Sequence, residues 1–262
     1  HENLTFLKQN LAVQMPEPAL FEGVYGVINL AGATIGKRWN RDYKKTLYDS
    51  RILTTRSVVQ AIAQTITKPT VLVQASAVGY YGNAGDMLLK ESSVPGNDFL
   101  STLCIDWEKE ALNAESFGTR VSIVRTAHVL GPGGLLSSLE PVFKNGLGGY
   151  FGNGKQYMPW IHYTDVVGIY LFLLEQNVSG AVNVSAGKTV SQKTLFTEFA
   201  QAIHAPLPFL WRIPHALAFL VLGSFADSLF SSQNTESEKI ISAGYLFQFT
   251  DIASALIDIY QK

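Results

Sequence analysis

The stretch VLVQASAVGYYGNAG, residues 71–85, joins an apolar run to a compact group of serine, glycine and tyrosine residues. An apolar run bounded by turn residues is typical of a strand buried on both faces of a parallel sheet. In α/β proteins, ligands bind at the carboxyl ends of such strands. The stretch therefore predicts a buried strand over residues 70–76, with Ser76, Tyr80 and Tyr81 beside a crevice.

Similar runs alternate with helical patterns through the first two thirds of the chain. Strands are predicted at 24–32 (VYGVINLAG), 120–131 (RVSIVRTAHVLG) and 180–187 (GAVNVSAG). Helices are predicted at 40–66, 99–115 and 165–176, with Asn40 and Asp165 as N-caps. This alternation predicts a parallel sheet with right-handed crossovers.

Composition excludes several classes of function. The net charge of −1 leaves no electrostatic footprint for nucleic acid or an anionic membrane. The single cysteine, Cys104, excludes a disulfide framework, and the five histidines show no metal-ligand spacing, so no metal is expected. The longest apolar run, 216–226, is too short to span a bilayer, and no signal peptide is visible. We expect a cytoplasmic protein whose natural chain starts before His1.

Three predicted strand ends, NLAG, ASAVGYYG and RTAHVLG, carry small or polar residues and should converge on one crevice. After Gly131 the sequence becomes dense in glycine and aromatic residues, which is typical of a functional loop system or a cap. We expect a Rossmann-like core from 1–130 and 160–190. A small, mostly helical substrate-binding cap is expected from 131–159 and 191–262.

Several motifs resemble one known family. They are VINLAGATIGKRWN, SRILTTRSVVQAI, SAVGYYG, DWEKEA, RTAHVLGPGG, FKNGLGGYFGNGKQYMPWIHYTDV and AVNVSA. In this order, over roughly residues 24 to 190, they resemble the extended short-chain dehydrogenase/reductase superfamily. Within it, they are similar to the NAD-dependent epimerase/dehydratase-like branch, some of whose members are labelled cell-division inhibitors.

The resemblance implies a Rossmann-like doubly wound α/β fold that binds NADP, with NAD the less favoured cofactor. The residues implied along the cofactor are Asn29, Ala31, Gly32, Ala75, Arg125, Thr126 and His128. Ser76 matches the family's catalytic serine or threonine, and Tyr81 is the tyrosine expected to orient the substrate with it. Trp160 and His162 match residues at the mouth of the substrate cleft.

Each candidate also has a structural interpretation. Ser76 could satisfy a backbone group at its strand end. Arg125 could form an ion pair with Glu108 or Glu110, and His128 could be a hydrogen-bonded structural residue.

The first departure from the family is the phosphate loop. Its members open with a strand, a G-x-x-G-x-x-G turn and a helix that holds the pyrophosphate. Residues 1–23 contain no such turn. Either an upstream segment supplies this βαβ unit or the protein does without it. The first case is favoured, because the strand at 24–32 is apolar on both faces, as expected of an interior strand, and without its neighbour it would leave a hydrophobic edge of the kind that natural proteins avoid. The second case predicts a swapped or oligomeric arrangement that covers this edge, such as a homodimer.

The second departure is the acid–base pair. The family's Tyr-x-x-x-Lys would fall at Leu100 and Cys104, neither of which can transfer the proton. A replacement acid would come from Tyr80, Tyr81, His128 or His162. Two functions are therefore open. One is an NAD(P)-dependent oxidoreductase or nucleotide-sugar epimerase-like enzyme acting on a small molecule. The other is a non-catalytic NADP(H)-binding sensor or regulatory protein.

Overall fold

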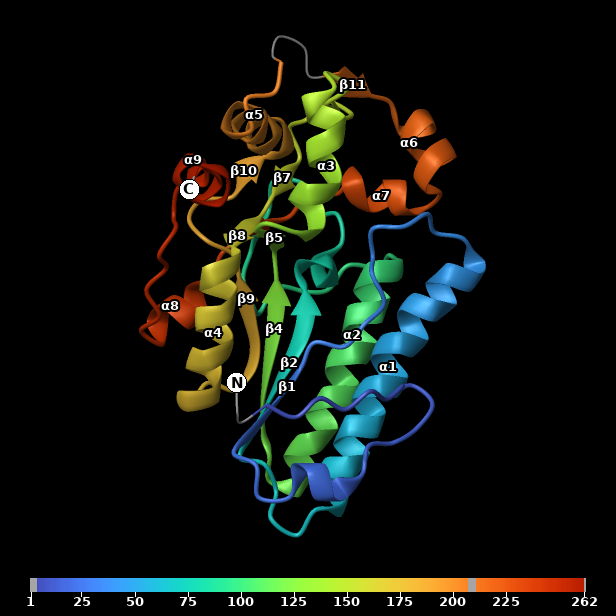
Figure 1. Ribbon diagram of the computed structural model, residues 1–262, viewed down its shortest axis with the longest axis vertical. Coiled ribbons are helices and arrows are strands. Elements are labelled where there is room, and N and C mark those ends of the chain that lie inside the picture. Colours follow the sequence, from blue (N-terminus) through green and yellow to red (C-terminus); the bar gives the residue numbers. More distant parts are fainter. Residues whose placement is uncertain (1–3, 207–210, 262) are drawn as a thin grey trace.

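The centre of the fold is a four-stranded parallel sheet in the order β1-β2-β4-β9 (Figure 1). The computed structural model describes residues 4–206 and 211–261. Its sheet strands are β1 (Gly26–Asn29), β2 (Val71–Ala77), β4 (Arg120–Thr126) and β9 (Gly180–Val184). In this register Ser76 lies opposite Arg125, and Arg125 lies opposite Asn183. The predicted α/β Rossmann-like sheet is thus confirmed over these strands.

Helices cover both faces of the sheet (Figure 1). One face is covered by α1 (Arg41–Gln64) and α2 (Phe99–Leu112), and the other by α4 (Tyr163–Glu175). Leu72 packs with Val58 and Ile62 of α1, whereas the alternate residues Val71 and Val73 belong to the core that includes α4. Both faces of β2 are therefore buried in apolar cores, which explains its continuous apolar run.

Of the two predicted N-cap residues, Asn40 is confirmed and Asp165 is not. Asn40 caps α1 as expected, because its side chain accepts a hydrogen bond from Tyr43 N at 2.8 Å. The prediction for Asp165 is wrong, because His162 is the N-cap of α4. The Asp165 carboxylate instead accepts hydrogen bonds from the backbone N–H groups of residues 248 and 249 in the tail.

The sequence predicts that the strand at 24–32 is interior, with its neighbour in an upstream unit; within the described residues, β1 lies at the edge of the sheet. Among the described residues its only strand partner is β2. Ile28 is 39% exposed, and Leu30, just beyond the strand, is 63% exposed. The described chain has no strand ahead of β1 to pair with the other edge.

A second lobe stands at the carboxyl ends of the strands (Figure 1). Its helices are α3 (Gly134–Lys144), α5 (Gln192–Ala202), α6 (His215–Leu222), α7 (Phe225–Leu229) and α9 (Ile252–Tyr260). Short strand pairs brace it: β5 (His128–Leu130) with β8 (Trp160–His162), β6 (Gly149–Phe151) with β11 (Trp211–Ile213), and β7 (Tyr157–Met158) with β10 (Val190–Ser191).

Part of the tail returns to the sheet. Strand β12 (Asn234–Thr235) pairs with β3 (Leu88–Leu89), and α8 (Glu238–Ser242) packs beside β9. Lys239 Nζ donates to Ala181 O of β9 at 3.1 Å. Residues 234–242, which the sequence assigned to the cap, are therefore packed on the core, and the boundary between core and cap stays a prediction.

Candidate active site

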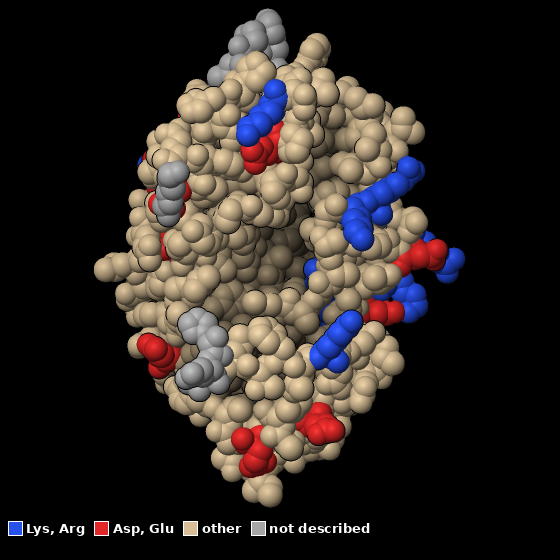
Figure 2. Space-filling view, viewed as in Figure 1, with Lys and Arg blue, Asp and Glu red and all other residues tan. Residues whose placement is uncertain are grey.

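The candidate site lies at the carboxyl ends of β1, β2 and β4, on the side of the sheet that faces the second lobe (Figure 1), and these strand-end residues are called its floor. Strands β2 and β4 point their carboxyl ends toward the second lobe (Figure 1). Figure 2 shows the surface hollowed between the part that carries α3 and α5 and the part that carries α1 and α2. Most of the visible surface in the hollow is uncharged, and Lys and Arg residues gather on its α1 side.

The end of β1 is shaped by Asn29, which is 4% exposed. Its Nδ2 donates to Thr55 Oγ1 at 3.0 Å and to Gln74 Oε1 at 2.9 Å, and its Oδ1 accepts from Ala31 N at 3.2 Å. The amide therefore holds the strand end against α1 and β2. It leaves Gly32, which is exposed, facing outward at the place predicted for the cofactor.

A buried ion pair joins β4 to α2. Arg125 Nε and Nη2 donate to Glu108 Oε1 and Oε2 at 2.9 and 2.8 Å, which is bidentate geometry. The Ser76 hydroxyl donates to the same Glu108 Oε1 at 2.7 Å. Burial lowers the pKa of Arg125, but the hydrogen bonds and charge of Glu108 outweigh burial and raise it. Of the two interpretations of Arg125, the structure shows the ion pair with Glu108.

Tyr81 extends this network across the sheet. Its hydroxyl lies 2.6 Å from Asn183 Oδ1 and 3.0 Å from Lys90 O, and it accepts from Arg125 Nη1 at 3.0 Å. Burial raises the pKa of Tyr81, and Arg125 opposes the rise. The neighbouring Tyr80 ring stacks 3.4 Å from the Arg125 guanidinium and is only half-buried. Of the two tyrosines, Tyr80 is therefore the more exposed to solvent.

The first two turns of α2 present Leu100 and Cys104 near the end of β2. Leu100 lies against Gly79, where an added Cβ would sit 3.4 Å from the Leu100 Cβ. Cys104 is buried, and burial raises the pKa of its thiol to about 12. These are the two positions at which the family resemblance places tyrosine and lysine.

The remaining cofactor candidates lie on β2, β4 and β5. Ala75 packs in the apolar cluster around Trp107, and Thr126 donates to Val124 O at 3.3 Å. His128 Nδ1 lies 2.9 Å from Pro159 O, and because a carbonyl only accepts, Nδ1 carries the proton. Burial lowers the pKa of His128, which favours the neutral ring with a lone pair on Nε2.

Trp160 and His162 are buried in the second lobe, with 1% and 0% of their surfaces exposed. His162 Nε2 lies 3.4 Å from Asp258 Oδ2 of α9, and its ring packs 4.0 Å from the Phe249 ring. The structure therefore places both side chains in a core and not on an open cleft mouth. Their contact with a substrate stays a prediction.

Two residues of the floor were not singled out from the sequence. Asn183 holds the Tyr81 hydroxyl, although 102 positions separate the two residues in the chain. Arg51 lies on α1 beside Gly32, where an added Cβ would meet Arg51 Cζ at 2.9 Å. A signal for Arg51 was present, because an arginine there interrupts the buried stripe formed by Leu47 and Thr55.

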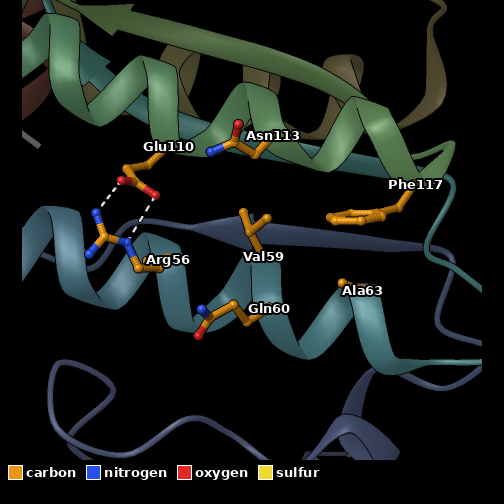
Figure 3. Close-up of a pocket in the computed structure, with 7 residues that line it drawn as sticks. All are labelled: Arg56, Val59, Gln60, Ala63, Glu110, Asn113 and Phe117. Atoms are coloured by element: carbon orange, nitrogen blue, oxygen red, sulfur yellow. Dashed lines mark hydrogen bonds and ion pairs between the residues drawn. The ribbon is translucent and has the colours of Figure 1, made fainter.

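A separate groove lies between α1 and α2. Figure 3 shows it lined by Arg56, Val59, Gln60, Ala63, Glu110, Asn113 and Phe117, with Arg56 and Glu110 paired across one end. No predicted site residue lines it. We therefore assign no role in the candidate site to this groove.

Comparison with known families identifies the chain. The NAD dependent epimerase/dehydratase family model matches residues 14–185, and a domain of unknown function, DUF1731, matches residues 213–259. The chain belongs to the NAD dependent epimerase/dehydratase family. The resemblance found in the sequence motifs is thus confirmed.

Its relatives carry the same family name. An epimerase family protein of Mycobacterium tuberculosis is 37% identical over 244 residues, covering 92% of this chain and 80% of that protein. One from Staphylococcus aureus is 34% identical over 241 residues, covering 90% and 79%. The human epimerase family protein SDR39U1, solved with NADPH, matches with a TM-score of 0.84 and 29% identity, covering 93% of this chain and 84% of that one.

Helices within the described residues fall short of the combined length and apolarity required to cross a membrane.

Proposed function

We propose that this member of the family binds NADP(H) in the hollow and uses it in redox or epimerase-like chemistry on a small molecule. The observation that carries the proposal is the family membership together with the human relative solved with NADPH. In this proposal the strand ends at Asn29, Ala31 and Gly32 line one side of the cofactor. The ends at Ala75, Thr126 and His128 line the other.

The site residues have different roles in this proposal. Ser76 and Tyr81 are fully engaged with Glu108, Arg125 and Asn183, so they are proposed to orient the substrate from a rigid floor. Bound NADPH would supply a hydride. The proton that accompanies it would come from a side chain that reaches the hollow.

His128 is the group best suited to move that proton. Its Nδ1–H is anchored to Pro159 O, so the ring orientation is set and Nε2 is the titrating atom. Trp160 and His162 are proposed to shape the substrate end of the hollow from behind, since both are buried.

The alternative is an NADP(H)-binding sensor without turnover. It is favoured by one observation, namely that α2 presents Leu100 and the inert thiol of Cys104 where the family carries its acid–base pair. In that case the same strand ends would bind the cofactor, and occupancy would alter a surface that a partner recognises.

Titration with NADPH and NADH, followed by nicotinamide fluorescence, tests the shared part of both proposals. Saturable binding with NADPH preferred is the expected result, and no binding of either nucleotide would overturn both. Turnover is then assayed with carbonyl compounds and sugar nucleotides. Activity that is lost in Ser76→Ala and Tyr81→Phe supports the enzyme, and binding without turnover across the panel supports the sensor.

A further inference from the structure

The second lobe carries an apolar helix on its outer surface. Seven of the eight residues of α6 are apolar, yet only Ala218 among them is buried. The side chains of Leu217, Phe219, Leu220 and Val221 are between 48% and 68% exposed. Single exposed apolar side chains are common in proteins, whereas a contiguous group marks a surface that meets another apolar surface. A helix that is apolar all round is usually covered by protein or by lipid.

Trp211 extends this apolar surface ahead of α6. It is 60% exposed, whereas the other three tryptophans of the chain are buried. Its Nε1 donates to Gly146 O at 3.3 Å, so the indole is anchored on the second lobe while most of it stays exposed. An aromatic ring with an apolar body and a polar end is typical of membrane interfaces. The α6 ridge is defined here as Trp211, Leu217, Phe219, Leu220 and Val221.

A basic segment lies against the end of α6. Trp39 N donates to Leu222 O at 3.0 Å. A Cβ on Gly223 would lie 3.4 Å from Arg38 Cγ. Residues 37–45 hold five Lys or Arg residues and one Asp. Figure 2 shows Lys and Arg side chains gathered next to the uncharged surface over α6, which is located in Figure 1.

The cations around the α6 ridge are not neutralised by acids. Arg212 lies just ahead of α6 and is exposed. Within residues 4–206 and 211–261, neither Arg38, Arg41 nor Arg212 forms an ion pair. Asp227 of α7 is an acid near α6, and it pairs with His215 Nε2 at 2.8 Å. The net charge of −1, from which the sequence predicted no attraction to an anionic membrane, therefore conceals a local excess of positive charge.

The charge of these flanking residues distinguishes between two coverings of the α6 ridge. In an isologous contact between two copies of the chain, the same patch meets itself, so the basic flanks would repel each other. A membrane that contains anionic lipids offers an apolar layer for the ridge and negative headgroups for the cations. With eight residues α6 is too short to span a bilayer, but a helix of this length can lie in the interface.

We propose that the α6 ridge docks on the surface of an anionic lipid membrane, with Arg38 and Arg212 against the headgroups. Stable attachment to a membrane surface takes two signals, and this surface combines an apolar helix with flanking cations. The proposal concerns an interaction surface on the second lobe and does not depend on the cofactor or on turnover.

The experiment measures binding of the intact protein to vesicles of two compositions. One set contains phosphatidylcholine mixed with phosphatidylglycerol, and the other contains phosphatidylcholine alone. Binding is measured by co-sedimentation and by tryptophan emission. Because Trp211 is the exposed tryptophan, a blue shift and quenching by brominated acyl chains report insertion of the ridge, and Trp211→Phe should remove both signals.

Two double variants test the two parts of the surface. Leu220→Ser with Val221→Ser should weaken binding to the mixed vesicles by at least about tenfold, because apolar area is no longer buried. Arg38→Gln with Arg212→Gln should weaken it by about fivefold for each charge removed, and the difference from wild type should shrink as salt is added. Circular dichroism and thermal unfolding verify that the variants are folded.

Matched controls make the same changes elsewhere on the surface. Ile66 and Leu246 are 93% and 86% exposed and lie outside the α6 ridge, so Ile66→Ser with Leu246→Ser should leave binding unchanged. Lys109→Gln with Lys188→Gln removes two exposed charges away from α6 and should weaken binding less than Arg38→Gln with Arg212→Gln does.

Four results would overturn the proposal. They are no binding to the mixed vesicles, equal affinity for the two vesicle compositions, losses in the ridge variants no larger than in their controls, and a dimer in analytical ultracentrifugation without vesicles that Leu220→Ser with Val221→Ser abolishes. The last result would assign the ridge to a second copy of the chain.

Discussion

Replacing Glu108 by Gln should strongly destabilise the protein, because it breaks the buried ion pair between α2 and β4. Glu108 is 6% exposed and Arg125 4%, so solvent does little to screen their interaction. The substitution keeps the side-chain shape but removes the charge, and the new amide can direct only one oxygen at the Arg125 fork. The Ser76 hydroxyl competes for that oxygen. A buried, bidentate arginine is left without a counter-charge.

The expected cost of Glu108→Gln is about 3–5 kcal/mol of unfolding free energy, which is typical when one partner of a buried ion pair is removed. For a chain of this size that corresponds to a fall in Tm of about 6–20 °C. Urea unfolding followed by far-UV circular dichroism measures the free energy directly.

Glu110→Gln is the matched control for Glu108→Gln. Glu110 also pairs with an arginine, Arg56, but that pair lies on the outer surface, so the loss should stay below about 1 kcal/mol. The double variant Glu108→Leu with Arg125→Met removes both buried charges and should recover much of the stability lost in Glu108→Gln. A loss in Glu108→Gln no larger than in Glu110→Gln would show that the buried pair is not the anchor of this floor.

Three further predictions concern single groups. Because burial raises the pKa of Cys104 to about 12, a thiol reagent at pH 8 should label it in urea but not in the native protein, and rapid native labelling would contradict its burial. Burial lowers the folded-state pKa of His128, so its contribution to stability is present above about pH 6.5 and is lost as pH falls. In urea unfolding at pH values from 7 to 5, His128→Gln should therefore lose less stability on acidification than the wild-type protein does. An unchanged pH dependence would count against the lowered pKa. Tyr81→Phe removes the hydroxyl between Asn183 and Arg125 and should cost about 1–3 kcal/mol in urea unfolding; a neutral effect would mean that water replaces it.

Local patterns predicted the central sheet because they follow from burial on both faces. The predicted strand at 70–76 and helix at 40–66 match β2 and α1 to within two residues at each end. The strand predicted at 120–131 is instead two strands, because the chain leaves the sheet after Thr126 and His128–Leu130 pairs with β8. That partner lies about thirty residues further along the chain, and hydrophobic periodicity contains no information on it.

Asp165 shows how a correct local rule fails. An acidic residue near the start of a helix is a good N-cap candidate, and nothing near Asp165 argues against that role. The tail supplies stronger partners, since the backbone N–H groups of residues 248 and 249 and the Tyr245 hydroxyl all donate to this carboxylate. The carboxylate is thus used to hold the tail on α4, which only the folded arrangement reveals.

The location of the candidate site could be predicted from the sequence, but its hydrogen-bond network could not. The strand-end rule brought Ser76 and Arg125 together, and both lie side by side in the register of β2 and β4. Which of their atoms remain available could not be predicted, because that depends on Glu108 and Asn183 on other elements. The roles of Ser76 and Tyr81 in catalysis accordingly stay predictions.

The two arginines of the floor, Arg125 and Arg51, differ in how far the fold compensates their charge. Arg125 has a bidentate carboxylate, a phenol and an aromatic ring, so its charge is fully compensated by the fold itself. Arg51 has two carbonyls and an aromatic ring but no acid in the described chain, and burial acts against its charge. An uncompensated, half-buried cation lowers the free energy of unfolding, and an apolar residue in the same place would avoid this loss. The fold therefore accounts for both the position and the charge of Arg125, whereas the contacts of Arg51 account for its position alone.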